Sequence, residues 1–208
     1  MFKLQGKIPR QVMVACSGGV DSMAVVDFLK RNHEVHLFYF NHGTKHGDEA
    51  EQFVRLYAER NNLLYQIRGC DNPKKPKGKS QEEYWREMRY GWMNMLSAYM
   101  PVITCHHLDD CVETYVWSSM HGTGKIVPYS NGQGVIRPFR MNRKKQFKMW
   151  CQLNDVPYIK DESNNDIKYM RNYIRHNMMP SVLRVNPGIY KTISKKVKAD
   201  DGAESSKI

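Results

Sequence analysis

The chain has 208 residues, of which 41% are hydrophobic, enough for one core with at most a small appendage. It has no run of about 18 or more apolar residues and no apolar stretch at its N-terminus. These absences argue against a membrane span and a signal peptide, so we expect a cytoplasmic protein. The net charge of +11 favours nucleic acid as a partner, with a merely solvated basic surface as the alternative.

Five cysteines occur in the chain, at positions 16, 70, 105, 111 and 151. Their number is odd and no two have the CxxC spacing. This argues against a disulfide framework, a structural zinc site and an iron–sulfur cluster.

Short apolar segments alternate four times with helical patterns along the first part of the chain. The apolar segments predict strands over residues 11–16, 34–42, 64–68 and 101–106. The helical patterns cover residues 23–32, 48–62, 80–99 and 109–120. This alternation predicts an α/β fold, a doubly wound, mostly parallel sheet with helices on both faces, whose ligands bind at the carboxyl ends of the strands.

The composition changes after Gly122. A short strand is expected over 135–139, and helices over 143–155, 169–183 and 186–198. We therefore expect a catalytic domain over 1–140, a helical extension over 141–198 and a disordered tail over 199–208.

The segment SGGVDS links the first predicted strand to the helix after it. Its two glycines allow a tight turn, and the start of the following helix offers free N–H groups to an anion. Asp21 suits a phosphate site if Mg²⁺ bridges it to the anion. The alternative is an ordinary strand-to-helix turn. The predicted nucleotide-binding residues are Ser17, Gly18, Gly19, Val20, Asp21 and Ser22, with Asn41 and His42 after the second strand.

A second polar segment, CHHLDDCVET, follows the fourth predicted strand. Asp110 and Glu113 are three residues apart at a helix start, so they share a face and could together hold an ammonium group. His106 could position or deprotonate a reacting group. One alternative is that Asp109 and Asp110 only cap the helix; another is a zinc site built from the cysteines, histidines and Asp109 of this segment.

Two groups of basic residues lie on predicted helices. Arg86 and Arg89 share a face at a spacing of three, and an arginine there could stabilise charge on a phosphate. Lys168, Arg171 and Arg175 form a stripe that suits an RNA backbone. The alternative for both groups is a solvated helix face.

Several of these segments resemble known families. SGGVDS resembles the pyrophosphate loop of the ATP-pyrophosphatases, which cleave ATP between its α and β phosphates. CHHLDDCVET resembles the HHxDDxxET stretch of the tRNA(Ile)-lysidine synthetases, which use ATP to attach lysine to the wobble cytidine of an isoleucine tRNA. The segments EVHLFYFNHGTKHGDEAEQFV, EEYWREMRY, IRPF and DESNNDIKYMRNYIRHNMMP agree with that family in the same order, so the resemblance extends over residues 12–180.

The resemblance implies ATP and Mg²⁺ as cofactors, and free L-lysine and tRNA(Ile) as partners. It implies that Asp110 and Glu113 hold the lysine ammonium, that Asp109 serves the Mg²⁺ and phosphate side with Asp21, and that Arg89 meets the α-phosphate. The helical extension with its basic stripe, and Asn172 within it, would contact tRNA. The expected catalytic residues are therefore Asp21, Arg89, His106 and Asp109. A homodimer remains an open alternative.

The chain also departs from the family pattern. KIVPYSNGQG follows GTG in place of a glycine- and leucine-rich turn, and His121 stands where the family has arginine. Larger relatives carry C-terminal domains that help grip the tRNA, so we expect a reduced or different tRNA contact. The remaining alternatives are a thiolase acting on tRNA, a non-catalytic nucleotide-binding relative, and an amidotransferase-coupled synthetase.

Overall fold

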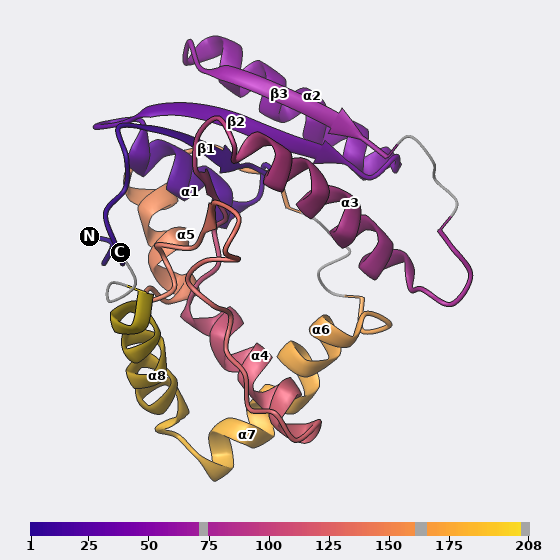
Figure 1. Cartoon of the computed structure of the whole chain (residues 1–208), viewed down its shortest axis with the longest axis vertical. Helices are drawn as coiled ribbons and strands as arrows, with labels where there is room; N and C mark the ends of the chain where they lie inside the picture. Colours follow the sequence, from indigo (N-terminus) through magenta and orange to yellow (C-terminus); the bar gives the residue numbers. More distant parts are fainter. Residues whose placement is uncertain (71–74, 161–165, 205–208) are drawn as a thin grey trace.

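The computed structural model in Figure 1 describes residues 1–70, 75–160 and 166–204. Its five strands, β1 (Gln11–Ala15), β2 (Glu34–Asn41), β3 (Leu64–Gly69), β4 (Val102–Ile103) and β5 (Val135–Ile136), form one sheet in the order β3-β2-β1-β4-β5. Every neighbouring pair is parallel. The prediction of a parallel α/β fold is confirmed.

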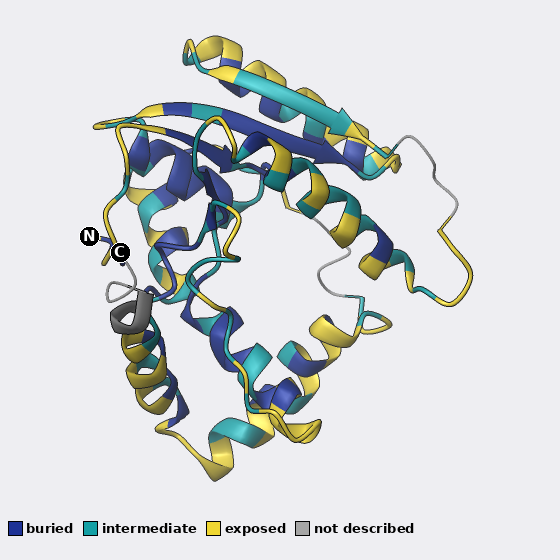
Figure 2. Ribbon diagram, viewed as in Figure 1, coloured by how far each residue is buried: buried dark blue, intermediate teal, exposed yellow. Residues whose placement is uncertain are grey.

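Alternate residues of β1 and β2 enter two different cores, as the period of two in a strand requires. Val14 and Leu37 pack with α1 (Val20–Leu29), α2 (Lys45–Arg60) and α5 (Lys144–Leu153). Met13 and Phe38 pack with α3 (Gln81–Leu96) on the opposite face. The sheet is therefore covered on both faces, and Figure 2 shows β1 and much of β2 in dark blue between the helices.

The remaining helices pack around α4 (Leu108–Met120), in the lower half of Figure 1. They are α6 (Met170–Tyr173), a π-helical segment (Ile174–Met178), α7 (Met179–Val185) and α8 (Ile189–Glu204). The last three share a hydrophobic cluster with α4. Buried Arg140 ties α8 to the rest of the protein, since its Nη1 lies 2.6 Å from Asp200 Oδ2.

Some boundaries differ from the sequence prediction. Helix α2 starts at Lys45, because the Thr44 side chain accepts a hydrogen bond from Gly47 N–H and caps it there. Helix α5, assigned to the extension, packs against α1 and contributes Phe147 to the main core. Helix α8 continues to Glu204, into the predicted tail, whose last four positions (205–208) lie outside the described residues. Within those described residues, no helix is long and apolar enough to cross a membrane.

Candidate active site

The phosphate loop lies between β1 and α1, at the carboxyl end of the central strand. Gly18 has φ +77°, a backbone conformation that glycine adopts without strain. A Cβ there would lie 3.1 Å from the side chain of Ile159 and 3.2 Å from that of Phe53. Ile159 also donates its N–H to the Gly18 carbonyl at 2.9 Å. A distant loop therefore holds this turn in place, and only a glycine fits it.

The serines of the loop fix its shape from within. Ser22 Oγ donates to the Gly19 carbonyl at 2.9 Å, accepts from Ser17 N–H at 3.2 Å and lies 3.3 Å from Ser17 Oγ. Gly19 caps α1 without any side-chain hydrogen bond. The first N–H groups of α1 thus lack a side-chain cap, which is the arrangement that binds anions at helix N-termini.

Asp21 faces the cavity from the first turn of α1. Its Oδ2 lies 3.1 Å from Lys144 Nζ and 3.7 Å from His107 Nε2. Its Oδ1 is buried and has no hydrogen-bond partner among the residues that the structure describes. Burial raises the pKa of Asp21, but the hydrogen bond and charge of His107 and the charge of Lys144 outweigh it, so the pKa lies below its usual value.

An ionised carboxylate with one oxygen free of protein partners fits a hard cation such as Mg²⁺. The described part of the chain brings no three His, Cys, Asp or Glu side chains together as a metal site. Mg²⁺ commonly binds through one or two carboxylates, with substrate phosphates and water completing its shell. The donor set around Asp21 matches that pattern.

His107, which the sequence analysis did not assign to the site, forms the N-cap of α4. The His107 ring Nδ1 accepts a hydrogen bond from the backbone N–H of Asp110 at 3.2 Å, and the backbone N–H of His107 donates to Asp110 Oδ2 at 2.9 Å. Burial alone would lower the pKa of His107. The nearby carboxylates of Asp110, Asp21 and Asp109 raise it by more than burial lowers it, so the pKa of His107 lies above its usual value. The residue type was visible in CHHLDD; which of the two histidines caps the helix was not.

Asp109 binds the start of α5 rather than lining the cavity. Its carboxylate accepts from Lys144 N–H at 2.8 Å, from Arg143 Nε at 3.2 and 3.3 Å, and from Tyr190 Oη at 3.1 Å. These contacts join α4 to α5 and α8. The metal-binding role expected for Asp109 stays a prediction, and the contacts made here give it a helix-anchoring role.

Asp110 and Glu113 share one face of α4, as their spacing predicted, and both are buried. Arg171 donates to Asp110 Oδ1 at 2.7 Å. Arg175 forms a bidentate pair with Glu113 at 2.8 and 2.9 Å. The carboxylates expected to hold an ammonium group and the arginines expected to meet RNA therefore contact one another. Lys168, by contrast, is exposed and pairs with Asp166 at 2.6 Å.

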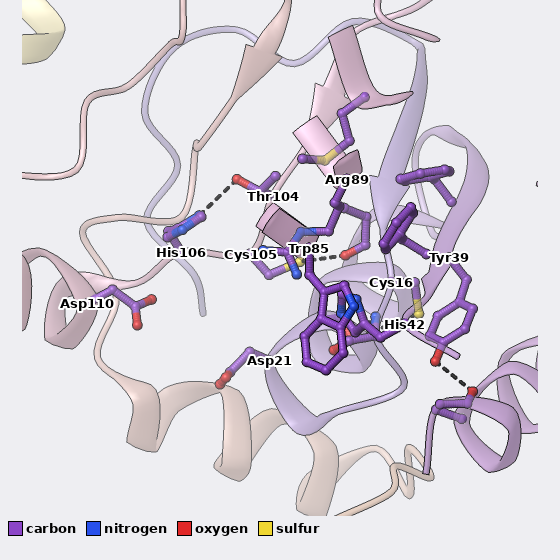
Figure 3. Close-up of a pocket in the computed structure, with 18 of the residues that line it drawn as sticks. Cys16, Asp21, Tyr39, His42, Trp85, Arg89, Thr104, Cys105, His106 and Asp110 are labelled. Carbon is purple, nitrogen blue, oxygen red and sulfur yellow. Dashed lines mark hydrogen bonds between the residues drawn. The ribbon is translucent and has the colours of Figure 1, made fainter. Parts of the chain in front are cut away.

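These elements surround a cavity of about 620 Å³, shown in Figure 3. The phosphate loop and the ends of β2 and β4 line it, α3 contributes one wall, and the segment from Tyr169 to Arg175 contributes another. Ten of the predicted site residues line it: Ser17, Asp21, Ser22, His42, Arg89, His106, Asp110, Arg171, Asn172 and Arg175. Seven do not: Gly18, Gly19, Val20, Asn41, Asp109, Glu113 and Lys168.

Three of the lining side chains differ in how they are held. His106 Nδ1 lies 2.9 Å from Thr104 Oγ1, and burial lowers the pKa of His106 to about 3, so its ring is neutral near pH 7. Arg89 forms no hydrogen bond or ion pair among the described residues, and burial lowers its pKa. His42 packs its ring against that of Trp85, with centroids 4.8 Å apart.

Asn41, expected at the nucleotide, holds α2 to the sheet. Its side chain donates to Asp48 and Glu51, both at 2.9 Å, and accepts from Gly43 N–H at 2.8 Å.

A parallel α/β sheet with such a loop after its central strand and a cavity above it defines a nucleotide-binding protein. The model of the PP-loop domain family matches residues 2–182, and the chain belongs to that family. Membership of it implies ATP binding. Among solved structures, NH3-dependent NAD synthetase from Campylobacter jejuni has the same fold, with a TM-score of 0.54 at 15% identity, over 95% of this chain and 88% of that one.

Among curated proteins, the chain is similar to several that are named tRNA(Ile)-lysidine synthase. The one from Thermosipho africanus is 33% identical over 85% of this chain and 45% of its own length. The one from Francisella philomiragia is 32% identical over 96% of this chain and 52% of its own length. The one from Thermotoga maritima is 28% identical over 88% of this chain and 49% of its own length. The chain thus spans about half the length of these relatives.

Proposed function

We propose that this chain carries the catalytic activity of a tRNA(Ile)-lysidine synthase. In the proposed reaction, an oxygen of the wobble cytidine attacks the α-phosphorus of ATP and pyrophosphate leaves. An amine of free lysine then displaces AMP, and a C–N bond forms.

One observation carries the proposal. A single cavity is lined by a phosphate loop, by the buried carboxylate of Asp110 and by three arginines, Arg89, Arg171 and Arg175. Anion-binding groups and a carboxylate in one cavity suit a reaction that brings a triphosphate and an amine together. The names of the curated relatives support tRNA and lysine as the substrates.

The residues divide into roles by their contacts. The phosphate loop and the N-terminus of α1 would bind the phosphates, and Mg²⁺ would be held by Asp21, where it supplies charge neutralisation. Arg89, which lacks a partner among the described residues, would meet the α-phosphate. His106 is neutral and would accept or position a proton rather than supply a positive charge.

The lysine site is constrained by the arginines. Asp110 Oδ1 already accepts from Arg171, and both oxygens of Glu113 accept from Arg175. A carboxylate has about four lone-pair positions. The incoming ammonium would therefore either join these pairs or displace an arginine, and the proposed role of Asp110 and Glu113 includes that exchange.

The test is a lysine-transfer assay. The protein is incubated with ATP, Mg²⁺, radiolabelled lysine and bulk tRNA, and label in the tRNA is measured together with the nucleotide products. We expect lysine-dependent labelling with release of AMP and pyrophosphate, and no labelling by the Asp21→Asn variant. ADP and orthophosphate as the only nucleotide products, or labelled tRNA in the absence of ATP, would contradict the proposal.

A further inference from the structure

Helix α3 presents to the cavity two hydrogen-bonding side chains for which the described residues offer no acceptor. Trp85 and Arg89 are four residues apart, so they lie on one face of the helix, and both line the cavity. The indole Nε1–H of Trp85 is buried and has no partner among the described residues. Arg89 likewise has no hydrogen bond or ion pair within that part of the chain. Figure 3 shows both side chains among the residues that line the cavity.

A buried donor without an acceptor costs about 1–3 kcal/mol, so proteins rarely keep one without use. Trp85 is held in place by its ring contact with His42, at 4.8 Å between centroids and 35° between planes. His42 packs in turn against Phe40, at 5.2 Å. The indole is therefore a supported aromatic surface with an unused N–H at its edge. A nucleobase is the ligand that offers both a π-face and edge acceptors.

The position of Trp85 along α3 favours the base of the RNA over the adenine of ATP. The C-terminal half of α3 is packed on the sheet through Met93 and Leu96. The N-terminal half has exposed neighbours, Glu82, Glu83, Arg86 and Glu87, and extends past the sheet in Figures 1 and 2. An RNA base entering from outside would therefore meet the Trp85 end of α3 before reaching Arg89 and the phosphate loop.

We propose that Trp85 binds the reacting base of the RNA, stacking on it and donating Nε1–H to an acceptor on its edge. This inference rests on the proposed function for the identity of the RNA. Enzymes that act on a base must take it out of its stack and commonly hold it against aromatic side chains. With Trp85 on the base and Arg89 one turn further in, the two side chains would align the base with the phosphate it attacks.

The test is a binding cycle that needs no turnover. Two anticodon stem-loop RNAs are compared by fluorescence anisotropy, one with the wobble cytidine and one abasic at that position, with the full chain as wild type, Trp85→Ala and Trp85→Phe. Stacking of one base is worth about 1–3 kcal/mol, so loss of the base should weaken wild-type binding about 5- to 150-fold. For the Trp85→Ala variant, loss of the base should weaken RNA binding by less than about twofold, because the stacking partner of the base is already absent.

Trp85→Phe separates the two parts of the contact, because phenylalanine keeps a stacking face and loses the N–H. We expect an intermediate dependence on the base. Trp92→Phe is the matched control: Trp92 lies on the same helix, lines no part of the cavity and has its ring 5.1 Å from the Arg68 guanidinium. It should show the wild-type dependence, and any variant is compared only if its circular dichroism matches the wild type.

Two outcomes would overturn the inference. If wild type and Trp85→Ala depend equally on the base, Trp85 does not bind it. If Trp85→Ala loses affinity for ATP while its base dependence matches the wild type, the indole serves the adenine. The lysine-transfer assay tests the proposed function separately. If tRNA is labelled but Trp85→Ala depends on the wobble base as strongly as the wild type, only the role of Trp85 is refuted. If Trp85→Ala loses the dependence on the base but no tRNA is labelled, only the proposed activity is refuted.

Discussion

The buried pair between Arg175 and Glu113 gives a quantitative prediction. Arg175→Met keeps a long unbranched side chain but removes the guanidinium that meets both Glu113 oxygens at 2.8 and 2.9 Å. Removing one partner of a buried ion pair costs about 3–5 kcal/mol, because the other charge is left buried and uncompensated. Glu113 would be left in that state, with 8% of its side chain exposed.

Two features place the expected loss at the lower end of that range. The Arg175 side chain is 23% exposed, so solvent already screens part of the pair. Arg171 Nε lies 3.9 Å from Glu113 Oε2 and would still offer a positive charge. We expect Arg175→Met to lower the free energy of unfolding by about 3 kcal/mol. Adding Glu113→Gln should then recover at least half of the loss, because no charge remains uncompensated.

The measurement is urea unfolding followed by circular dichroism, with the slope of each transition compared to confirm a common unfolded state. Arg10→Met is the control, since the pair between Arg10 and Glu34 is mostly exposed, and its urea midpoint should match the wild type. The reasoning is refuted if Arg175→Met unfolds at the wild-type midpoint. It is also refuted if the double variant is as unstable as the two single losses added together, because uncoupled residues behave in that way.

Three further predictions concern the site. Asp21→Asn should abolish Mg²⁺-dependent release of pyrophosphate while the circular dichroism of the folded protein is kept, and it should lower the urea midpoint, because it removes the negative charge that pairs with Lys144 Nζ at 3.1 Å. Lys168→Ala should reduce the slope of log affinity for tRNA against log salt by about 0.7–0.9, because Lys168 is exposed, whereas the inward-facing Arg175 should change it less. The folded pKa of His106 (about 3) lies below its usual 6.5, so the unfolded chain binds the proton first and stability falls as the pH drops from 6.5 towards 3. His106→Gln should therefore lose less stability than wild type between about pH 7 and about pH 5, as measured by urea midpoints.

Local sequence patterns predicted the sheet, the helices and the loop because each depends on nearby residues. The turn after β1 needs glycine at Gly18, and the period of two in β1 and β2 separates the residues that enter the two cores. The spacing of Asp110 and Glu113 likewise placed them on one face of α4. These features follow from the geometry of a strand or helix and need no knowledge of distant segments.

Contacts between distant segments were the part that spacing could not predict. Arg171 and Asp110 are 61 positions apart, and the packing of the π-helical segment, which directly follows α6, against α4 brings them together. The sequence spacing placed Lys168 on the same basic helix face as Arg171 and Arg175. In the structure α6 begins at Met170, so Lys168 lies before the helix, where it pairs with Asp166. His106 and His107 are adjacent in the sequence but have different positions in the structure: His106 lines the cavity and His107 caps α4. Which histidine takes which position depends on the packing of distant segments.

The distribution of partners within the cavity indicates where a ligand would gain most. Asp21, Asp110 and Arg175 already have partners of opposite charge, so a ligand that binds them must replace or share an existing contact. Trp85 and Arg89 have no hydrogen-bond partner within the described part of the chain, so an acceptor there adds a hydrogen bond. At Trp85 it also removes the cost of a buried donor, because the indole Nε1 is buried. Contacts with Trp85 and Arg89 of α3 would therefore contribute most to the binding energy of an incoming nucleotide. Asp110 on α4 would instead select a ligand that can replace or share its contact with Arg171.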